Sequence, residues 1–233
     1  MSTDTKALPD TGSEPSALRL VLTLTIAGLI SGLAIVSIFE VTLPTITANK
    51  ARELREAVFK VLPGVSNMQK LVFKKDALQP STEKIDDAPF VYGGYDDEGK
   101  FIGYALPGQA PGFADTIKIL YGYRPAQGII VGMEVLESRE TPGLGDKIYK
   151  DADFVANFTE LAVQPKIVTV KKGAKSAPNE VEAITGATIS SKVIVKIMNN
   201  THQEWISRLP PPGSEPSLKL APPPTPSAPA DEQ

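Results

Sequence analysis

The feature that most constrains the fold is an uncharged apolar run near the N-terminus, "LVLTLTIAGLISGLAIVSIF", which extends from Leu20 to Phe39. A helix of about twenty residues rises roughly 30 Å, which matches the hydrocarbon core of a bilayer. Signal peptides have shorter apolar cores of about 7–15 residues. A surface helix of a soluble protein would need a polar face, which this run lacks. We therefore predict an uncleaved membrane anchor over residues 18–43.

The charges that flank this run leave its orientation open. Lys6 and Arg19 precede it, and Lys50, Arg52 and Arg55 follow it. The positive-inside count therefore does not favour an external C-terminal domain.

The rest of the N-terminal part divides at Pro44. Residues 1–17 are polar and rich in Pro, Ser and Thr, so we expect a disordered tail. Pro44 is expected to break the anchor helix, and residues 44–72 are expected to form a connecting helix with one apolar stripe that packs on the following domain. The stripe consists of Leu54, Ala57, Val58, Val61 and Leu62.

Residues 73–209 have the pattern of an α+β domain. Short apolar or alternating runs, punctuated by Gly and Pro, predict strands joined by hairpin-length turns, and hence a mostly antiparallel sheet. Two helices are expected, one over 152–162 and one from Thr188 or Ser190 to Ile206. Residues 210–233 are dense in proline and are expected to be extended and disordered. The runs that predict strands are "FVYGGYD", "FIGYALPG", "TIKILYGY", "GIIVGMEVLE" and "KIVTVKKG".

The composition excludes several kinds of chemistry. The chain has no cysteine, which rules out thiolate metal sites and thiol catalysis, and a single histidine, His202, which argues against a histidine-based metal site or triad. The formal net charge of −3 gives no reason to expect a nucleic-acid partner. We expect no metal site, and any chemistry must come mainly from hydroxyls, carboxylates or a cofactor.

One stretch, "VEAITGATISSKVIVKIMNN", concentrates hydroxyls where a helix is expected to begin. Thr185, Thr188, Ser190 and Ser191 lie within seven residues, around Gly186-Ala187. A hydroxyl there can cap the helix. Alternatively, small residues and the unpaired N–H groups of a first helical turn suit a phosphate. Local chemistry leaves both interpretations open.

A second stretch, "ESRETPGLGDKI", follows an apolar strand. It is either a plain strand-to-helix turn or a loop whose backbone N–H groups cradle a flat ring. The residues of this loop are Glu140, Thr141, Pro142, Gly143, Leu144 and Gly145.

With both motifs present, in this order and behind one N-terminal span, the chain resembles the FMN-binding domain family. That family includes the G subunit of Rnf electron-transport complexes and the C subunit of sodium-translocating NADH:quinone reductases. The resemblance covers the span, the connecting helix and the domain to about Leu209.

The resemblance implies a covalent flavin. In the family, a flavin transferase attaches FMN through its phosphate to the last threonine of an Asp-x-x-(Ser/Thr)-Gly-Ala-Thr pattern. Thr185, Gly186 and Ala187 match this pattern, Thr188 is the residue that would bear FMN, and Glu182 stands at the aspartate position. Ser190 is a second-choice attachment site, and Ser191 and the Glu140–Gly145 loop would lie near the flavin.

The resemblance also implies a role and a location. We expect a redox subunit of an ion-translocating oxidoreductase, Rnf-type and linked to ferredoxin and NAD, with no independent catalysis. Its N-terminus would be cytoplasmic and its flavin domain periplasmic, on a single pass through the inner membrane. Its partners would be other subunits of the complex, the flavin transferase and the lipid bilayer. The alternatives are a membrane-tethered sensory or scaffold module, or the equivalent subunit of a sodium-translocating NADH:quinone reductase. Tyr92, Tyr95 and Tyr104 are further candidates for contact with the flavin ring.

Overall fold

The computed structural model describes residues 16–81 and 88–219, in two compact units that divide between Ala51 and Arg52. The expected disorder of residues 1–15 and 220–233 lies outside the described residues. The first helix, α1 (Ala17–Val61), contains a window of mean hydropathy 2.3 that is long and apolar enough to cross a membrane. The predicted anchor is therefore present as a helix.

Pro44 does not end this helix, contrary to our expectation. The φ angle that proline imposes is compatible with a helix, so helical backbone can continue through Pro44, although the residue cannot donate a backbone hydrogen bond and its ring crowds the preceding turn. The connecting helix expected within 44–72 is accordingly the last part of α1, and it ends at Val61, just before Pro63-Gly64, where the sequence predicts that the helical pattern stops.

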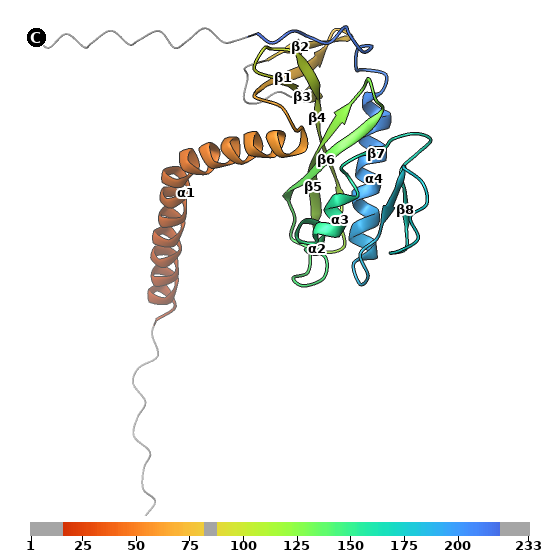
Figure 1. The fold of residues 1–233 in the computed structure, drawn as a ribbon. Coiled ribbons are helices and arrows are strands. Elements are labelled where there is room, and N and C mark those ends of the chain that lie inside the picture. The colour runs from red at the N-terminus through yellow and green to blue at the C-terminus, as the bar shows by residue number, and fades with distance from the viewer. Residues whose placement is uncertain (1–15, 82–87, 220–233) are drawn as a thin grey trace, which may run out of the picture. The chain divides into compact units, whose positions relative to one another are not determined.

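The second unit is built on a seven-stranded antiparallel sheet with the strand order β2-β1-β3-β4-β5-β6-β7 (Figure 1). The predicted α+β class and antiparallel sheet are confirmed. Strands β1 and β2 were not expected, and β1 begins before the predicted domain boundary at residue 73. The sheet strands are β1 (Asn67–Lys74), β2 (Ala77–Pro80), β3 (Phe90–Tyr95), β4 (Phe101–Pro111), β5 (Thr116–Arg124), β6 (Ile129–Glu137) and β7 (Leu161–Ala162).

Two short helices, a small ribbon and one long helix complete the fold. Helices α2 (Lys147–Lys150) and α3 (Ala152–Ala156) follow β6, and a two-stranded parallel ribbon of β8 (Val168–Val170) and β9 (Glu180–Glu182) precedes α4 (Thr188–Trp205). The helix expected over 152–162 is much shorter. The Asn157 side chain donates to the carbonyl oxygens of Asp153 and Phe154, both at 3.1 Å, and so closes the last turn of α3.

The two faces of the sheet are covered by different helices. The predicted apolar stripe at the end of α1 is buried against Tyr92, Ala105, Leu120 and Val131 on one face, as expected. A Cβ atom added to Gly122 of β5 would overlap the Val61 carbonyl oxygen of α1, so only glycine fits where this strand contacts the helix. The larger core cluster lies between the sheet and α4.

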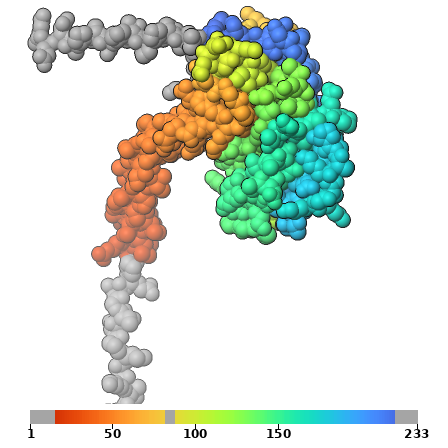
Figure 2. Space-filling view, in the orientation of Figure 1, coloured from red at the N-terminus to blue at the C-terminus, as the bar shows by residue number. Residues whose placement is uncertain are grey.

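The segment that follows α4 lies against the sheet as far as the structure describes it. We expected disorder from residue 210, but the Tyr95 hydroxyl donates to the Pro216 carbonyl at 2.6 Å and the Lys219 N–H donates to the Gln69 side chain at 2.7 Å. Tyr95 is fully buried, so its hydroxyl needs an acceptor inside the fold, and this segment supplies one. Figure 2 shows the dark blue segment beside the yellow strands.

Candidate functional site

The two motifs meet at one end of the sheet. The turn between β4 and β5, the loop that follows β6 and the first turn of α4 come together there, because Lys118 near the start of β5 pairs with Glu137 at the end of β6. Helix α4 packs along β4, where a Cβ atom added to Gly108 would lie 2.5 Å from the Thr201 hydroxyl. The sheet register and this close helix packing therefore position the site.

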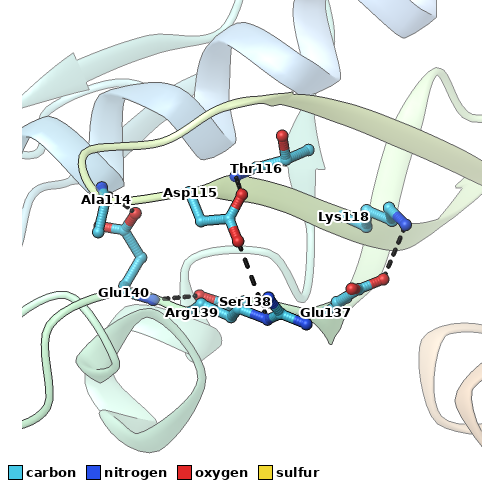
Figure 3. Close-up of polar contacts among 8 residues, drawn as sticks. All are labelled: Ala114, Asp115, Thr116, Lys118, Glu137, Ser138, Arg139 and Glu140. Carbon is cyan, nitrogen blue, oxygen red and sulfur yellow. Dashed lines mark hydrogen bonds and ion pairs between the residues drawn. The ribbon is translucent and has the colours of Figure 1, made fainter. Parts of the chain in front are cut away.

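Charged side chains fasten the loop after β6 to the neighbouring hairpin (Figure 3). Lys118 and Glu137 form an ion pair of 2.7 Å, and the guanidinium of Arg139 lies 3.9 Å from the Asp115 carboxylate. Both pairs are exposed and are worth little energy individually. Glu137 and Arg139 of these pairs lie just before Glu140, the residue at which the chain places a side chain in the interior.

Glu140 is the polar centre of the site, and only 6% of it is exposed. One carboxylate oxygen accepts from the N–H groups of Phe113 (2.9 Å) and Ala114 (3.0 Å), and the other accepts from the Ser190 hydroxyl at 2.6 Å. One buried carboxylate thus joins the β4–β5 turn, the loop after β6 and the start of α4.

These bonds also determine the charge state of Glu140. Burial alone would raise the pKa of its carboxyl group, but the hydrogen bonds from Ser190 and from the backbone of Ala114 and Phe113 outweigh burial and place the pKa below its ordinary value of 4.5. The carboxylate is therefore ionised at neutral pH and accepts hydrogen bonds only.

The loop after Glu140 is a compact turn with an exposed tip. The Thr141 carbonyl accepts from the N–H groups of Leu144 (3.2 Å) and Gly145 (3.0 Å), and Gly143 has a φ of +77° that favours glycine. Thr141, Pro142, Gly143 and Leu144 are exposed, whereas Gly145 is buried. A Cβ atom at Gly145 would lie 2.7 Å from Glu140, so this glycine allows the loop to close over the carboxylate.

The Thr-Gly-Ala-Thr stretch forms the other half of the site. Gly186 has a φ of +86°, and its nearest neighbour for an added Cβ atom is the Leu144 side chain at 3.6 Å, so the two loops are adjacent. Helix α4 begins at Thr188, as predicted, with Ala187 at the N-cap position. Among the described residues no side-chain hydrogen bond caps the helix, so the interpretation of Thr188 or Ser190 as a cap is wrong.

The four hydroxyls of this stretch divide into an inner and an outer pair. Ser190 donates to Glu140, while Ser191 donates to the Ala187 carbonyl at 2.9 Å and accepts from the Ile184 N–H at 3.1 Å. Both serines are buried. Thr185 and Thr188 are exposed, and the Thr188 hydroxyl has only a long contact of 3.5 Å to the Ile184 carbonyl. Thr188 is therefore the accessible hydroxyl on the helix itself.

The start of α4 can receive an anion. Within the described part of the chain, the N–H groups of Thr188, Ile189 and Ser190 have no backbone acceptor. Such groups lie at the positive end of the helix dipole and suit a phosphate. Two large apolar side chains near this helix start are exposed, Leu144 to 49% and Ile189 to 56%. Exposed apolar surface of this kind suits the flat apolar part of a ligand such as FMN. The residues present thus fit a flavin phosphate beside Thr188.

Glu182 does not join this site. Its carboxylate accepts from the N–H groups of Gly173 (3.0 Å) and Lys175 (3.3 Å), in the turn between β8 and β9. Its own N–H donates to the Asn157 side chain at 3.0 Å. Glu182 was predicted for the site, but its side chain bonds to the turn between β8 and β9 instead.

The tyrosines predicted as ring contacts are also elsewhere. Tyr92 packs in the core cluster under α1, and Tyr104 is fully buried near the start of β4. The β4–β5 turn begins eight residues beyond Tyr104, roughly 26 Å along an extended strand, so these rings do not line the site.

Sequence reasoning missed the β4–β5 turn, "GFAD", as part of the site. The backbone of Phe113 and Ala114 holds Glu140, and the Phe113 ring is 68% exposed beside it. An aromatic residue in a short polar turn between two predicted strands was the available signal.

The sequence of this chain is similar to those of known proteins. Residues 112–203 match the model of the FMN-binding domain. The chain is 31% identical over 194 residues to the G subunit of the Na(+)-translocating ferredoxin:NAD(+) oxidoreductase complex of Acetobacterium woodii, covering 80% of this chain and 90% of that one. It is 29% identical to the G subunit of the proton-translocating ferredoxin:NAD(+) oxidoreductase complex of Clostridium ljungdahlii, covering 78% and 87%.

The fold has a match among solved structures. The crystal structure of NqrC from Shewanella oneidensis superimposes with a TM-score of 0.52 at 20% identity, covering 65% of this chain and 91% of that chain. At this identity the match concerns the fold alone.

Proposed function

The chain belongs to the FMN-binding domain family, with the G subunits of ion-translocating oxidoreductase complexes among its relatives, and on that premise we propose that it is an electron-transfer subunit of such a complex. We propose the Rnf type, linked to ferredoxin and NAD. The relatives from Acetobacterium woodii and Clostridium ljungdahlii, which match over most of their length, belong to ferredoxin:NAD(+) oxidoreductase complexes. The protein is then a redox component of a translocase and has no separate reaction of its own.

The cofactor in this proposal is FMN esterified to Thr188. The observation that carries this assignment is the division of the hydroxyls: Ser190 and Ser191 are buried and bonded inward, whereas Thr188 is exposed at the first position of α4. Ser190, the second-choice site, is 3% exposed and donates to Glu140, so attachment there would require the site to open.

The chain's own residues bind and orient the cofactor in this arrangement. The first N–H groups of α4 hold the phosphate, and the positive φ of Gly186 lets the chain turn beside it. Glu140 fixes the relative positions of the two loops and the hairpin turn. Bound FMN supplies the electron-carrying chemistry, and the protein supplies position and electrostatics. A flavin transferase is required for the attachment.

The location follows the same proposal. Helix α1 anchors the chain by a single pass in the inner membrane, with the N-terminus cytoplasmic and the flavin domain periplasmic. A domain of this length is translocated largely regardless of its flanking charges. A covalent ester prevents loss of the flavin where it could not be recaptured.

Intact mass of the full-length protein, co-expressed with a flavin transferase, tests the attachment. We expect one FMN on the parent chain, none on Thr188→Ala, and one on the control Thr185→Ala, which removes the neighbouring exposed hydroxyl. Covalent FMN on Thr188→Ala would refute the assignment. A parent chain without flavin would instead favour the sensory or scaffold alternative.

A further inference from the structure

A groove lined by positively charged side chains runs along the exposed side of α4. Two adjoining hollows of about 430 and 400 Å³ share Lys166, Asn199 and Asn200 in their walls. One wall is α4, and the other is the chain that leads from β7 into β8 and includes Val168 and Thr169. Figure 2 shows the blue helix surface beside the teal segment. We call these two hollows the α4 groove.

Three lysines line the α4 groove, and of the residues that the structure describes no acidic one lines either hollow. Lys166 comes from the chain before β8, and Lys192 and Lys196 come from α4. Within the described residues, the side chains of all three are without an ion pair, although other lysines in this fold, such as Lys118 and Lys150, are paired. In a chain with a net charge of −3, this is a local concentration of unneutralised positive charge.

The walls of the α4 groove are held in place. The Asn199 side chain accepts from the Ile167 N–H at 3.2 Å and donates to the Ile167 carbonyl at 2.8 Å, which fastens the chain before β8 to the helix. A partner that enters the groove would therefore not have to order its walls, which lowers the cost of binding.

The α4 groove lies beside the flavin site. Thr188, Lys192 and Lys196 are spaced four residues apart on one helix, so their side chains lie along one side of it. Lys192 is about 6 Å along the axis from Thr188. A molecule bound to the two lysines would therefore lie next to the proposed attachment point.

The shape and composition of the groove fit a protein segment better than a small anion. From Lys192 to Gln203 it extends roughly 17 Å along the helix. Exposed apolar side chains lie in its walls, Val168 in one hollow (41% exposed) and Ile206 in the other (49% exposed). A single anion would cover neither, whereas protein interfaces combine apolar anchors with charged and amide groups around them.

We propose that the α4 groove docks an acidic segment of another subunit of the same membrane complex, and that this contact brings the electron-transfer partner to the flavin at Thr188. The partner is defined by its chemistry: an extended stretch with Asp or Glu side chains facing Lys166, Lys192 and Lys196, and apolar side chains near Val168 and Ile206. The proposal rests on the electron-transfer role proposed above.

Cross-linking of the intact complex tests this directly. The complex is purified through a tag on the full-length chain and treated with a carbodiimide, which joins amines to carboxylates in contact. We expect Lys192 or Lys196 to be joined to an Asp or Glu of another subunit. A map in which the three groove lysines join no carboxylate of another subunit would overturn the proposal.

A matched pair of charge-reversal variants provides the second measurement. Lys192→Glu with Lys196→Glu changes the groove, and Lys100→Glu with Lys171→Glu makes the same charge change at exposed positions outside it. We expect the groove variant to retain the other subunits at least about tenfold less well at physiological salt, and the control variant to retain them as the parent does.

Flavin content separates this proposal from the one it rests on. We expect both variants to carry FMN as the parent does, with the same thermal unfolding measured by the fluorescence of Trp205, the single and buried tryptophan. Equal retention of subunits by both variants overturns the docking proposal and leaves the flavin assignment intact. Loss of flavin from the groove variant with full retention of subunits also overturns it, in favour of docking by the flavin transferase. A parent without flavin contradicts the proposed function instead.

Discussion

The two motifs of this chain each contain a glutamate, and the two side chains have opposite surroundings. Glu140 is buried and accepts hydrogen bonds from two N–H groups of the β4–β5 turn and from Ser190 of α4. Glu182, which occupies the acidic position of the threonine motif, is only partly buried and accepts from the N–H groups of Gly173 and Lys175 in the turn between β8 and β9.

Glu140 therefore assembles the site, whereas Glu182 stabilises only a segment of chain that precedes the site. Glu140 connects three segments that are distant in the sequence, so its loss would disturb all three. Glu182 organises a turn of its own ribbon, which ends shortly before Thr185. The sequence pattern places both glutamates in the motifs of the site, but their hydrogen bonds show that only Glu140 holds the site together.

The largest effect is expected from Glu140→Ala. The substitution leaves the buried Ser190 hydroxyl and the N–H groups of Phe113 and Ala114 without their acceptor, and hydrogen bonds to a charged group contribute about 1.5–3 kcal/mol each to stability. Phe113 and Ala114 are exposed, so water can replace the carboxylate at their N–H groups, and the loss should be smaller than the sum of the three bonds. We expect the free energy of unfolding to fall by about 3 kcal/mol, measured by denaturant titration of the solubilised full-length chain with Trp205 fluorescence. Glu160→Ala, at an exposed glutamate, is the control with the same charge change. A loss no larger than that of Glu160→Ala would remove the distinction between the two glutamates.

The charge on Glu140 gives the second prediction. Its folded-state pKa is below the ordinary value of 4.5, because the bonds from Ser190 and the backbone of Ala114 and Phe113 outweigh the effect of burial. The carboxylate therefore contributes its full stability above the ordinary pKa, and that contribution is lost as the pH falls through the folded-state pKa.

The comparison variant is Glu140→Gln, which is nearly isosteric and does not titrate. We expect the parent to be more stable than this variant by a constant margin above about pH 5.5, and the margin to shrink progressively at lower pH. Unfolding midpoints measured from neutral pH down to about pH 3 give the margin. A margin that stays constant over this range would show that the carboxylate is not the stabilising form.

Much of the fold could be predicted because its signals are local. The apolar run of α1, the stripe from Leu54 to Leu62 and the alternating strands β3 to β6 each show their periodicity within a few residues. Signals that depend on tertiary contacts were missed. Strand β1 carries polar residues among its apolar ones, and α3 ends early because the Asn157 side chain closes its last turn.

The candidate site also has features that could be predicted from the sequence and features that could not. The start of α4 at Thr188 and the residues of both loops could be predicted from their local pattern. The inward direction of Ser190 and Ser191 could not, because it depends on where Glu140 and Ile184 lie in the fold. The aromatic side chain of Phe113 marks its turn in the sequence, but the contact with Glu140 is made by the backbone N–H, which no residue pattern reveals. Glu140, Phe113 and Ser190 are distant in the sequence, so their contacts could be found only from the fold.

The smallest effect is expected from Glu182→Ala. Its two hydrogen bonds lie in an exposed turn where water can replace the carboxylate, so we expect a loss of only about 0.5–1 kcal/mol, again against Glu160→Ala. Because the carboxylate bonds to the turn at Gly173 and Lys175, and not to the loops that Glu140 joins, flavin content in the presence of the transferase should stay near that of the parent. In-gel flavin fluorescence relative to protein measures it. A Glu182→Ala protein that folds as the parent does but carries no FMN would mean that the transferase reads this carboxylate directly. In that event Glu182 belongs to the recognition of the site although it lies outside the hydrogen bonds that assemble it.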